Sequence, residues 1–191
     1  IRQILSYLAN YSLYAYEGEI RQGYLTLPGG HRLGLVGRAV LEGDRITSLM
    51  EISALNLRLA HEKKGCADSV ISCLWEQDNL CDTLVVSPPG GGKTTLLRDC
   101  IRQISDGTKE HRGRTVGVVD ERSEIAGCCR GVPENDVGMR TDVLDGCPKT
   151  LGMRMLLRSM APEVLAVDEI GSEEDVREIQ YAANCGCTVF A

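Results

Sequence analysis

A glycine-rich loop between an apolar run and a helix-length segment constrains the fold of this chain more than any other feature. Residues 83–86 form a short apolar run typical of a buried strand, and residues 94–104 have the pattern of a helix. Between them, residues 87–94 read Ser-Pro-Pro-Gly-Gly-Gly-Lys-Thr. Strand, glycine-rich loop and helix in this order are the setting of a phosphate-binding loop. The sequence therefore predicts an α/β domain that binds a nucleotide.

The residue types of this loop indicate its chemistry. Glycines let backbone N–H groups turn inward around phosphates, and the start of the following helix adds its positive dipole end. Lys93 supplies a positive charge, and the Thr94 hydroxyl is a candidate ligand of Mg²⁺. Ser87 stands where the usual pattern has its first glycine, which mainly permits the turn out of the strand. We expect ATP and Mg²⁺ as cofactors, with the nucleotide held by Ser87, Pro88, Pro89, Gly90, Gly91, Gly92, Lys93, Thr94 and Thr95.

Two acidic residues follow the apolar run 164–167, which has the pattern of a buried strand. A carboxylate at the carboxyl end of such a strand can hold Mg²⁺ through water, and its neighbour can polarise an attacking water molecule. Asp168 is therefore the expected metal residue, together with Thr94, and Glu169 is a candidate catalytic base.

A second acidic pair, Asp120 and Glu121, ends the strand expected at residues 115–119. The carboxyl ends of parallel strands face the same crevice, so Glu121 can also point at the terminal phosphate. Two glutamates thus compete for the role of base, and Glu169 is the favoured one. The alternative for Glu121 is a structural salt bridge with Arg122.

Two arginines, Arg154 and Arg158, share one side of the helix expected at residues 151–160. Such a side is ordinarily solvated. In a ring ATPase, however, an arginine that reaches a neighbour's terminal phosphate can raise the rate by ~10³-fold or more. Arg122, Arg130 and Arg140 are rival candidates for this role.

The order of apolar runs indicates two parts of different architecture. Residues 1–16 are expected to form a helix with Ile1, Ile4, Leu5, Leu8 and Ser12 at helical spacing. Strands at 24–27, 32–41 and 45–59 predict a small antiparallel meander. After a linker at 63–65 and a helix at 67–75, apolar runs alternate with helix-length segments, which indicates a parallel sheet. Ser172 and Asp175 have the spacing of a capping box that starts a helix to about Asn184, before a last strand at 187–190.

Composition narrows the classes of function. Acidic residues number 27 against 21 basic ones, and the net charge of −6 argues against a broad surface for duplex nucleic acid. One Trp and one Phe argue against a stacking platform for single strands. The nine cysteines lack the paired spacing of a zinc site, so we expect reduced thiols. No apolar run approaches the ~20 residues that cross a bilayer, so no membrane span is expected.

Segments spread along the chain carry a family resemblance. In residues 84–99, 118–125 and 160–171, and upstream in 23–34 and 55–58, the sequence resembles the stage III AA family of sporulation ATPases from endospore-forming bacteria. That family is related to the type II and type IV secretion ATPases. The resemblance implies an α/β fold with a RecA-like P-loop NTPase core and a parallel sheet in residues 63–191, truncated at its C-terminal end. It further implies a partial α+β domain with an antiparallel meander in residues 1–62.

The resemblance also implies a function and partners. It points to an ATP-hydrolysing motor of a secretion-type channel, like the mother-cell ATPase that energises the channel between mother cell and forespore. The expected assembly is a homo-hexamer at the cytoplasmic face of a membrane complex, with membrane-embedded channel proteins as partners. Carried over by motif, Lys93 and Thr94 match the Walker A residues, and Asp168 and Glu169 the Walker B acids.

The resemblance covers further residues. Asp120 and Glu121 match an acidic box, and Arg154 and Arg158 match arginines that face the nucleotide. Arg58 is a further candidate for approaching a neighbour's nucleotide.

Three other functions remain open on the sequence. A RecA-like ATPase that acts on single-stranded nucleic acid is the main alternative, although the acidic balance and the scarcity of aromatic residues oppose it. A small-molecule P-loop kinase would need an arginine-rich lid, which the sequence does not show. In a subunit that binds a nucleotide without hydrolysing it, Glu121 and Glu169 would have no catalytic role.

Overall fold

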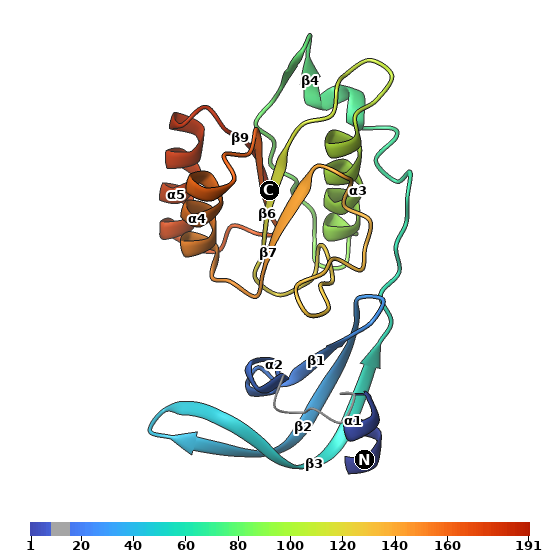
Figure 1. Ribbon diagram of the computed structural model, residues 1–191, viewed down its shortest axis with the longest axis vertical. Helices are drawn as coiled ribbons and strands as arrows, with labels where there is room; N and C mark the ends of the chain where they lie inside the picture. Colours follow the sequence, from blue (N-terminus) through green and yellow to red (C-terminus); the bar gives the residue numbers. More distant parts are fainter. Residues whose placement is uncertain (9–15) are drawn as a thin grey trace. The chain divides into compact units, whose positions relative to one another are not determined.

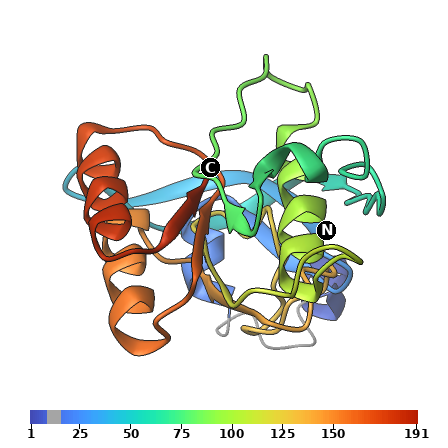
Figure 2. The same ribbon diagram turned by 90° about the horizontal axis from the view of Figure 1, so that it is seen from above.

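Two structural units divide the chain, residues 1–61 and residues 62–191. The computed structural model describes residues 1–8 and 16–191. Figure 1 shows the elements of both units along the sequence, and Figure 2 shows them from a second direction.

The first unit is an antiparallel meander accompanied by short helices. Its elements are α1 (Arg2–Leu8), α2 (Glu17–Arg21), β1 (Tyr24–Leu27), β2 (His31–Glu42) and β3 (Arg45–Arg58). The strand order β1-β2-β3, antiparallel throughout, confirms the predicted meander. The opening helix is observed as α1, and the rest of its predicted span, including Ser12, lies in residues 9–15, outside the described residues.

Alternating leucines form the core of this unit. Leu25, Leu27, Leu33 and Leu35 are buried on one face of β1 and β2, where they pack with Leu5 and other apolar side chains. This period of two is the pattern of a half-buried sheet. Since β1 pairs only with residues 31–34, the outer part of β2 and β3 continues as a two-stranded ribbon whose side chains are largely exposed.

The second unit is built on a parallel sheet with the strand order β7-β6-β8-β9. Its elements are η2, a 3-10 helix (Ile71–Leu74), β4 (Trp75–Glu76), β5 (Asn79–Leu80), α3 (Lys93–Asp106), β6 (Val116–Asp120), β7 (Thr141–Asp145), α4 (Lys149–Ser159), β8 (Val164–Val167), α5 (Glu173–Asn184) and β9 (Thr188–Phe190). The α/β class and the parallel sheet predicted from the sequence are confirmed.

Helices cover both faces of this sheet: α3 lies on one face, and α4 and α5 lie on the other (Figures 1 and 2). Alternate residues of the central strands pack into two cores. Val118 and Ala166 join the core beneath α3, whereas Val119, Leu165 and Val167 join the core beneath α4 and α5. Both central strands are therefore buried on both sides, which explains their unbroken apolar sequences.

The capping box predicted at Ser172 is present at the start of α5. The Ser172 hydroxyl accepts a hydrogen bond from the Asp175 N–H, and the Asp175 carboxylate accepts one from the Ser172 N–H, both at 3.1 Å. These two bonds satisfy backbone donors that the first turn of a helix leaves unpaired. They fix where the chain turns after β8.

The helix predicted at residues 67–75 is wrong. This segment forms turns and the short η2, and then enters the hairpin of β4 and β5. Two contacts divert it: the Asp99 carboxylate binds the Ala67 N–H at 2.9 Å, and the Leu74 carbonyl accepts from the Cys81 N–H at 2.8 Å. A partner from another element thus holds the segment at each end.

The buried strand predicted at residues 83–86 is also wrong in part. Leu84 is 63% exposed and Val86 is 83% exposed. The backbone nevertheless runs beside β9, because the Thr83 N–H donates to Val189 O at 2.8 Å and the Ala191 N–H donates to Thr83 O at 3.0 Å. The segment therefore extends the sheet beyond β9 without being covered on both faces.

Glu163 joins the starts of the two central strands. Its Oε1 accepts from Arg112 Nη2 at 2.6 Å and from Arg114 Nη1 at 2.9 Å, while its Oε2 accepts from the Thr115 N–H at 3.1 Å. Burial alone would raise the pKa of this carboxyl, but the two arginines and the backbone donor lower the pKa of Glu163 to about 2. The ionised carboxylate is therefore part of the folded structure.

We expect Glu163→Gln to remove a pH-dependent part of the stability. Because the pKa of Glu163 is lower in the folded chain than its ordinary 4.5, the carboxylate stabilises the fold above that value and loses this effect as pH falls toward 2. Over this range the unfolding free energy of the wild type should fall by about 1 kcal/mol more than that of the variant. The effect is small because the Glu163 side chain is partly exposed and solvent screens its charge. Urea unfolding at several pH values measures this, and parallel pH curves for both proteins would contradict it.

Candidate nucleotide-binding site

The loop at residues 87–92 turns the chain from the sheet edge into α3. Gly90 and Gly92 have φ angles of 75° and 85°, in the left-handed region that favours glycine. The Gly91 N–H donates to Pro88 O at 3.0 Å, and a Cβ on Gly91 would lie 3.2 Å from the Ser87 side chain. Ser87 is thus accommodated because position 91 has no side chain.

The start of α3 is suited to an anion. Gly92 is its N-cap residue and provides no side-chain cap. The first backbone N–H groups of a helix have no partner within the helix, and the helix dipole favours negative charge at this end. A phosphate group at this position would therefore find donors that the helix itself does not use.

The predicted phosphate and metal residues meet at one point. Lys93 Nζ donates to the main-chain carbonyl of Asp168 at 2.7 Å, and Thr94 Oγ1 donates to Asp168 Oδ1 at 2.9 Å. Lys93 and Thr94 open α3, whereas Asp168 follows β8. The fold therefore brings the glycine-rich loop and the acidic strand end into direct contact.

The surroundings of Asp168 favour a cation. Burial raises the pKa of Asp168, the nearby Glu124 and Glu169 raise it further, and the Thr94 hydroxyl and Lys93 lower it. A carboxylate in this position gains from a neighbouring positive charge, and carboxylate and hydroxyl oxygens are the hard donors that Mg²⁺ prefers. Asp168 and Thr94 thus fit the ion. Within residues 1–8 and 16–191, no cluster of three His, Cys, Asp or Glu side chains forms a metal site, and Mg²⁺ typically takes few protein ligands plus substrate phosphates.

The two candidate bases lie in a chain of ion pairs. Arg122 Nη2 is 3.1 Å from Glu169 Oε1, and Lys149 Nζ lies 3.0 Å from Glu121 Oε2 and 3.8 Å from Glu169 Oε1. The sequence predicted neither the pairing of Arg122 with Glu169 nor any role for Lys149. A lysine at the first position of a helix with no acid in its first turn was the available signal, since a cation there opposes the dipole.

Asp120 has a different place from its neighbour Glu121. It is fully buried, and its carboxylate accepts from the N–H groups of Glu124, Ile125 and Ala126 at 2.8, 3.0 and 2.8 Å. Burial raises the pKa of Asp120, and these three bonds oppose that rise. Asp120 therefore shapes the loop after β6, and of the acidic pair Glu121 is the partly exposed member.

Of the arginines singled out in the sequence, Arg122 lies beside this meeting point, where it pairs with Glu169. Arg154 of α4 forms a two-bond ion pair with Glu178 of α5, at 2.6 and 2.5 Å, and Arg158, also in α4, is exposed. Among the rival candidates, Arg140 Nη1 donates to Ser105 O near the far end of α3, at 3.2 Å, and Arg130 is exposed. Arg58 is the last residue of β3 in the first unit. An action of any of these on a neighbour's nucleotide stays a prediction.

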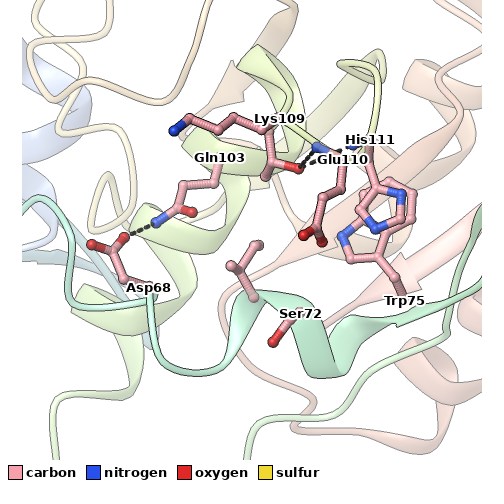
Figure 3. Close-up of a pocket in the computed structure, with 9 residues that line it drawn as sticks. Asp68, Ser72, Trp75, Gln103, Lys109, Glu110 and His111 are labelled. Carbon is pink, nitrogen blue, oxygen red and sulfur yellow. Dashed lines mark hydrogen bonds between the residues drawn. The ribbon is translucent and has the colours of Figure 1, made fainter.

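A separate hollow of about 610 Å³ lies at the other end of α3 (Figure 3). Trp75 and His111 stack in its wall with ring centroids 4.0 Å apart, and Gln103 donates to Asp68 at 2.7 Å. Since α3 has 14 residues, its ends are roughly 20 Å apart. The hollow and the glycine-rich loop therefore cannot share one small ligand.

None of the helices in the described ranges combines the length and apolar character of a membrane-spanning helix.

Comparison with solved structures supports the fold. The chain matches the X-ray structure of the Legionella pneumophila ATPase DotB with a TM-score of 0.54 and 21% identity, covering 83% of this chain and 42% of DotB. The predicted RecA-like core is therefore confirmed as a fold.

Comparison with known sequences shows the family. The chain is 48% identical over 187 residues to stage III sporulation protein AA of Bacillus subtilis, covering 98% of this chain and 61% of that protein. It is 29% identical over 144 residues to the protein SEEDLING PLASTID DEVELOPMENT 1 of Arabidopsis thaliana, covering 74% of this chain and 20% of that protein. The model of the family described as sporulation stage III, protein AA, matches residues 1–191, and the chain belongs to this family.

Proposed function

We propose that this chain is the ATP-hydrolysing part of a motor that drives a secretion-type channel in sporulation. The observation that carries the proposal is the contact of Lys93 and Thr94 with Asp168, which joins the glycine-rich loop to the acidic strand end. Membership of the sporulation family and a fold shared with the ATPase DotB support it.

The residues at this contact have different roles in ATP hydrolysis. The loop N–H groups and Lys93 bind the phosphates of ATP, and Thr94 and Asp168 hold Mg²⁺, which supplies charge neutralisation at the phosphates when bound. Glu169 follows Asp168 directly and orients the attacking water. Glu121, at the end of the neighbouring strand, is the alternative base.

The channel, its assembly and its place in the cell belong to the proposal as well. A homo-hexamer at the cytoplasmic face of a membrane complex, bound to membrane-embedded channel proteins, is the arrangement that the sporulation family and the secretion ATPases suggest. In such a ring Arg154 or Arg158 would serve a neighbour's nucleotide. The chain spans 61% of its B. subtilis relative, so these statements extend to the whole protein only as proposals.

Substitutions of the phosphate lysine and of the favoured base should separate binding from hydrolysis. We expect Lys93→Ala to weaken ATP binding at least tenfold, because the charge that contacts the phosphates is lost. Glu169→Gln should leave binding within about threefold and lower kcat by roughly 10²-fold or more, since it removes only the base. Equilibrium binding and steady-state phosphate release measure both effects, with Lys109→Ala on the exposed surface as the control.

Three results would redirect the proposal. Full activity of Glu169→Gln would move the base to Glu121. Stimulation of the wild type by single-stranded DNA would favour a nucleic-acid ATPase over a channel motor. Unchanged ATP binding in Lys93→Ala would contradict the assigned site.

Asp168→Asn should change the Mg²⁺ dependence of the protein. The variant keeps the hydrogen-bond acceptor for Thr94 but loses the negative charge that attracts the ion. We expect the Mg²⁺ concentration for half-maximal binding of ADP to rise about tenfold or more, while metal-free ADP binding stays within about twofold. Calorimetric titrations with and without Mg²⁺ measure this, and an unaltered Mg²⁺ requirement would exclude Asp168 as the metal residue.

A further inference from the structure

Lys149 is a largely buried lysine in an unusual position. It is the first residue of α4, and its side chain is 10% exposed. Lysine is rarely buried unless its charge is paired, and a cation at a helix N-terminus opposes the helix dipole. The first turn of α4 contains no acidic residue that would relieve this. The compensation must therefore come from outside the helix.

That compensation comes from the ends of the two central strands. Glu121 Oε2 lies 3.0 Å from Lys149 Nζ, and Glu169 Oε1 lies 3.8 Å from it. Val119 and Val167 are paired in the sheet, and each glutamate follows its paired valine by two residues. From the start of α4, Lys149 thus reaches across the end of β6 toward the end of β8.

The two glutamates need a cation between them. Neighbouring strands lie about 4.8 Å apart, so two carboxylates at equivalent positions repel each other strongly when both are ionised. Arg122 pairs with Glu169 at 3.1 Å, and Lys149 Nζ lies 3.0 Å from the Glu121 carboxylate and 3.8 Å from the Glu169 carboxylate. The Lys149 ammonium therefore reduces the repulsion between the two carboxylates.

We propose that Lys149 is a positioning residue, whose ammonium compensates the charge of Glu121 and so holds Glu169 in place to orient the attacking water. The inference rests on the proposed ATPase function. Lys149 does not touch the nucleotide in this account. It acts through the carboxylates, so its loss affects the rate and leaves ATP binding intact.

The test compares four proteins with the wild type: Lys149→Met, Lys149→Arg, Lys149→Met with Glu121→Gln, and Lys109→Met as a control lysine on the exposed surface. We expect Lys149→Met to lower kcat by roughly 10- to 100-fold, the cost of a misplaced group, with the dissociation constant of ATP within about twofold. Lys149→Arg keeps the charge and should stay within about threefold of the wild type. The double variant should recover at least threefold over Lys149→Met, because it removes the unpaired carboxylate together with its cation.

Each other outcome overturns the inference. Wild-type kcat in Lys149→Met, or equal losses of kcat in the methionine and arginine variants, would each exclude charge compensation. A double variant no better than the single one in both kcat and Tm would exclude it as well. A loss of ATP binding in Lys149→Met would make the residue part of the binding site instead.

Thermal unfolding without nucleotide tests the charge compensation independently of ATP hydrolysis. Lys149→Met should lower Tm by roughly 3 °C or more, and Glu121→Gln in the same chain should restore part of that loss. If the wild type does not hydrolyse ATP, the proposed function is wrong. The Tm values alone then decide whether Lys149 compensates the charge of Glu121. Equal Tm values for the single and double variants would overturn it.

Discussion

The contact between the start of α3 and the end of β8 is the interaction on which the candidate site depends. Lys93 and Thr94 belong to the helix, Asp168 directly follows the strand, and two hydrogen bonds of 2.7 and 2.9 Å join them. The packing on both faces of the sheet makes this contact possible. Leu97 and Ile101 anchor α3 in one core, while Leu165 and Val167 anchor β8 in the other. A destabilising substitution in either core would therefore shift the start of α3 relative to the end of β8.

Charge compensation is the second constraint on this edge of the sheet. Carboxylates end both central strands, and each is balanced in a different way: Asp120 by three backbone N–H groups, Glu121 by Lys149 and Glu169 by Arg122. Asp168 is held by the Thr94 hydroxyl and by Lys93 on its main-chain carbonyl, and burial raises its pKa. The Asp168 carboxylate and the Thr94 hydroxyl together offer the hard oxygen donors that Mg²⁺ prefers, which is the reason to assign the metal to them.

The sequence predicted the parts of the fold that local patterns determine. The glycine-rich loop, the helix after it, the apolar strand β8 and the capping box at Ser172 each have a signal within a few residues. The strand β7 was missed because only two apolar residues stand between polar ones in Thr141–Asp145, at the edge of the sheet. The helix predicted at 67–75 is absent because Asp99, 32 residues away in the sequence, holds the Ala67 N–H, and because the chain leaves the segment into the hairpin of β4 and β5. The ion pairs of Lys149 were missed for the same reason: they join three elements that only the folded sheet brings together.

A crystal structure with Mn²⁺ in place of Mg²⁺ and a non-hydrolysable ATP analogue tests the central claim most directly. Anomalous scattering locates the metal independently of any assumption about the site. Our account predicts a metal peak beside the Thr94 hydroxyl and the Asp168 carboxylate, with the terminal phosphate at Lys93. Nucleotide bound elsewhere, or a metal peak away from Thr94 and Asp168, would contradict it.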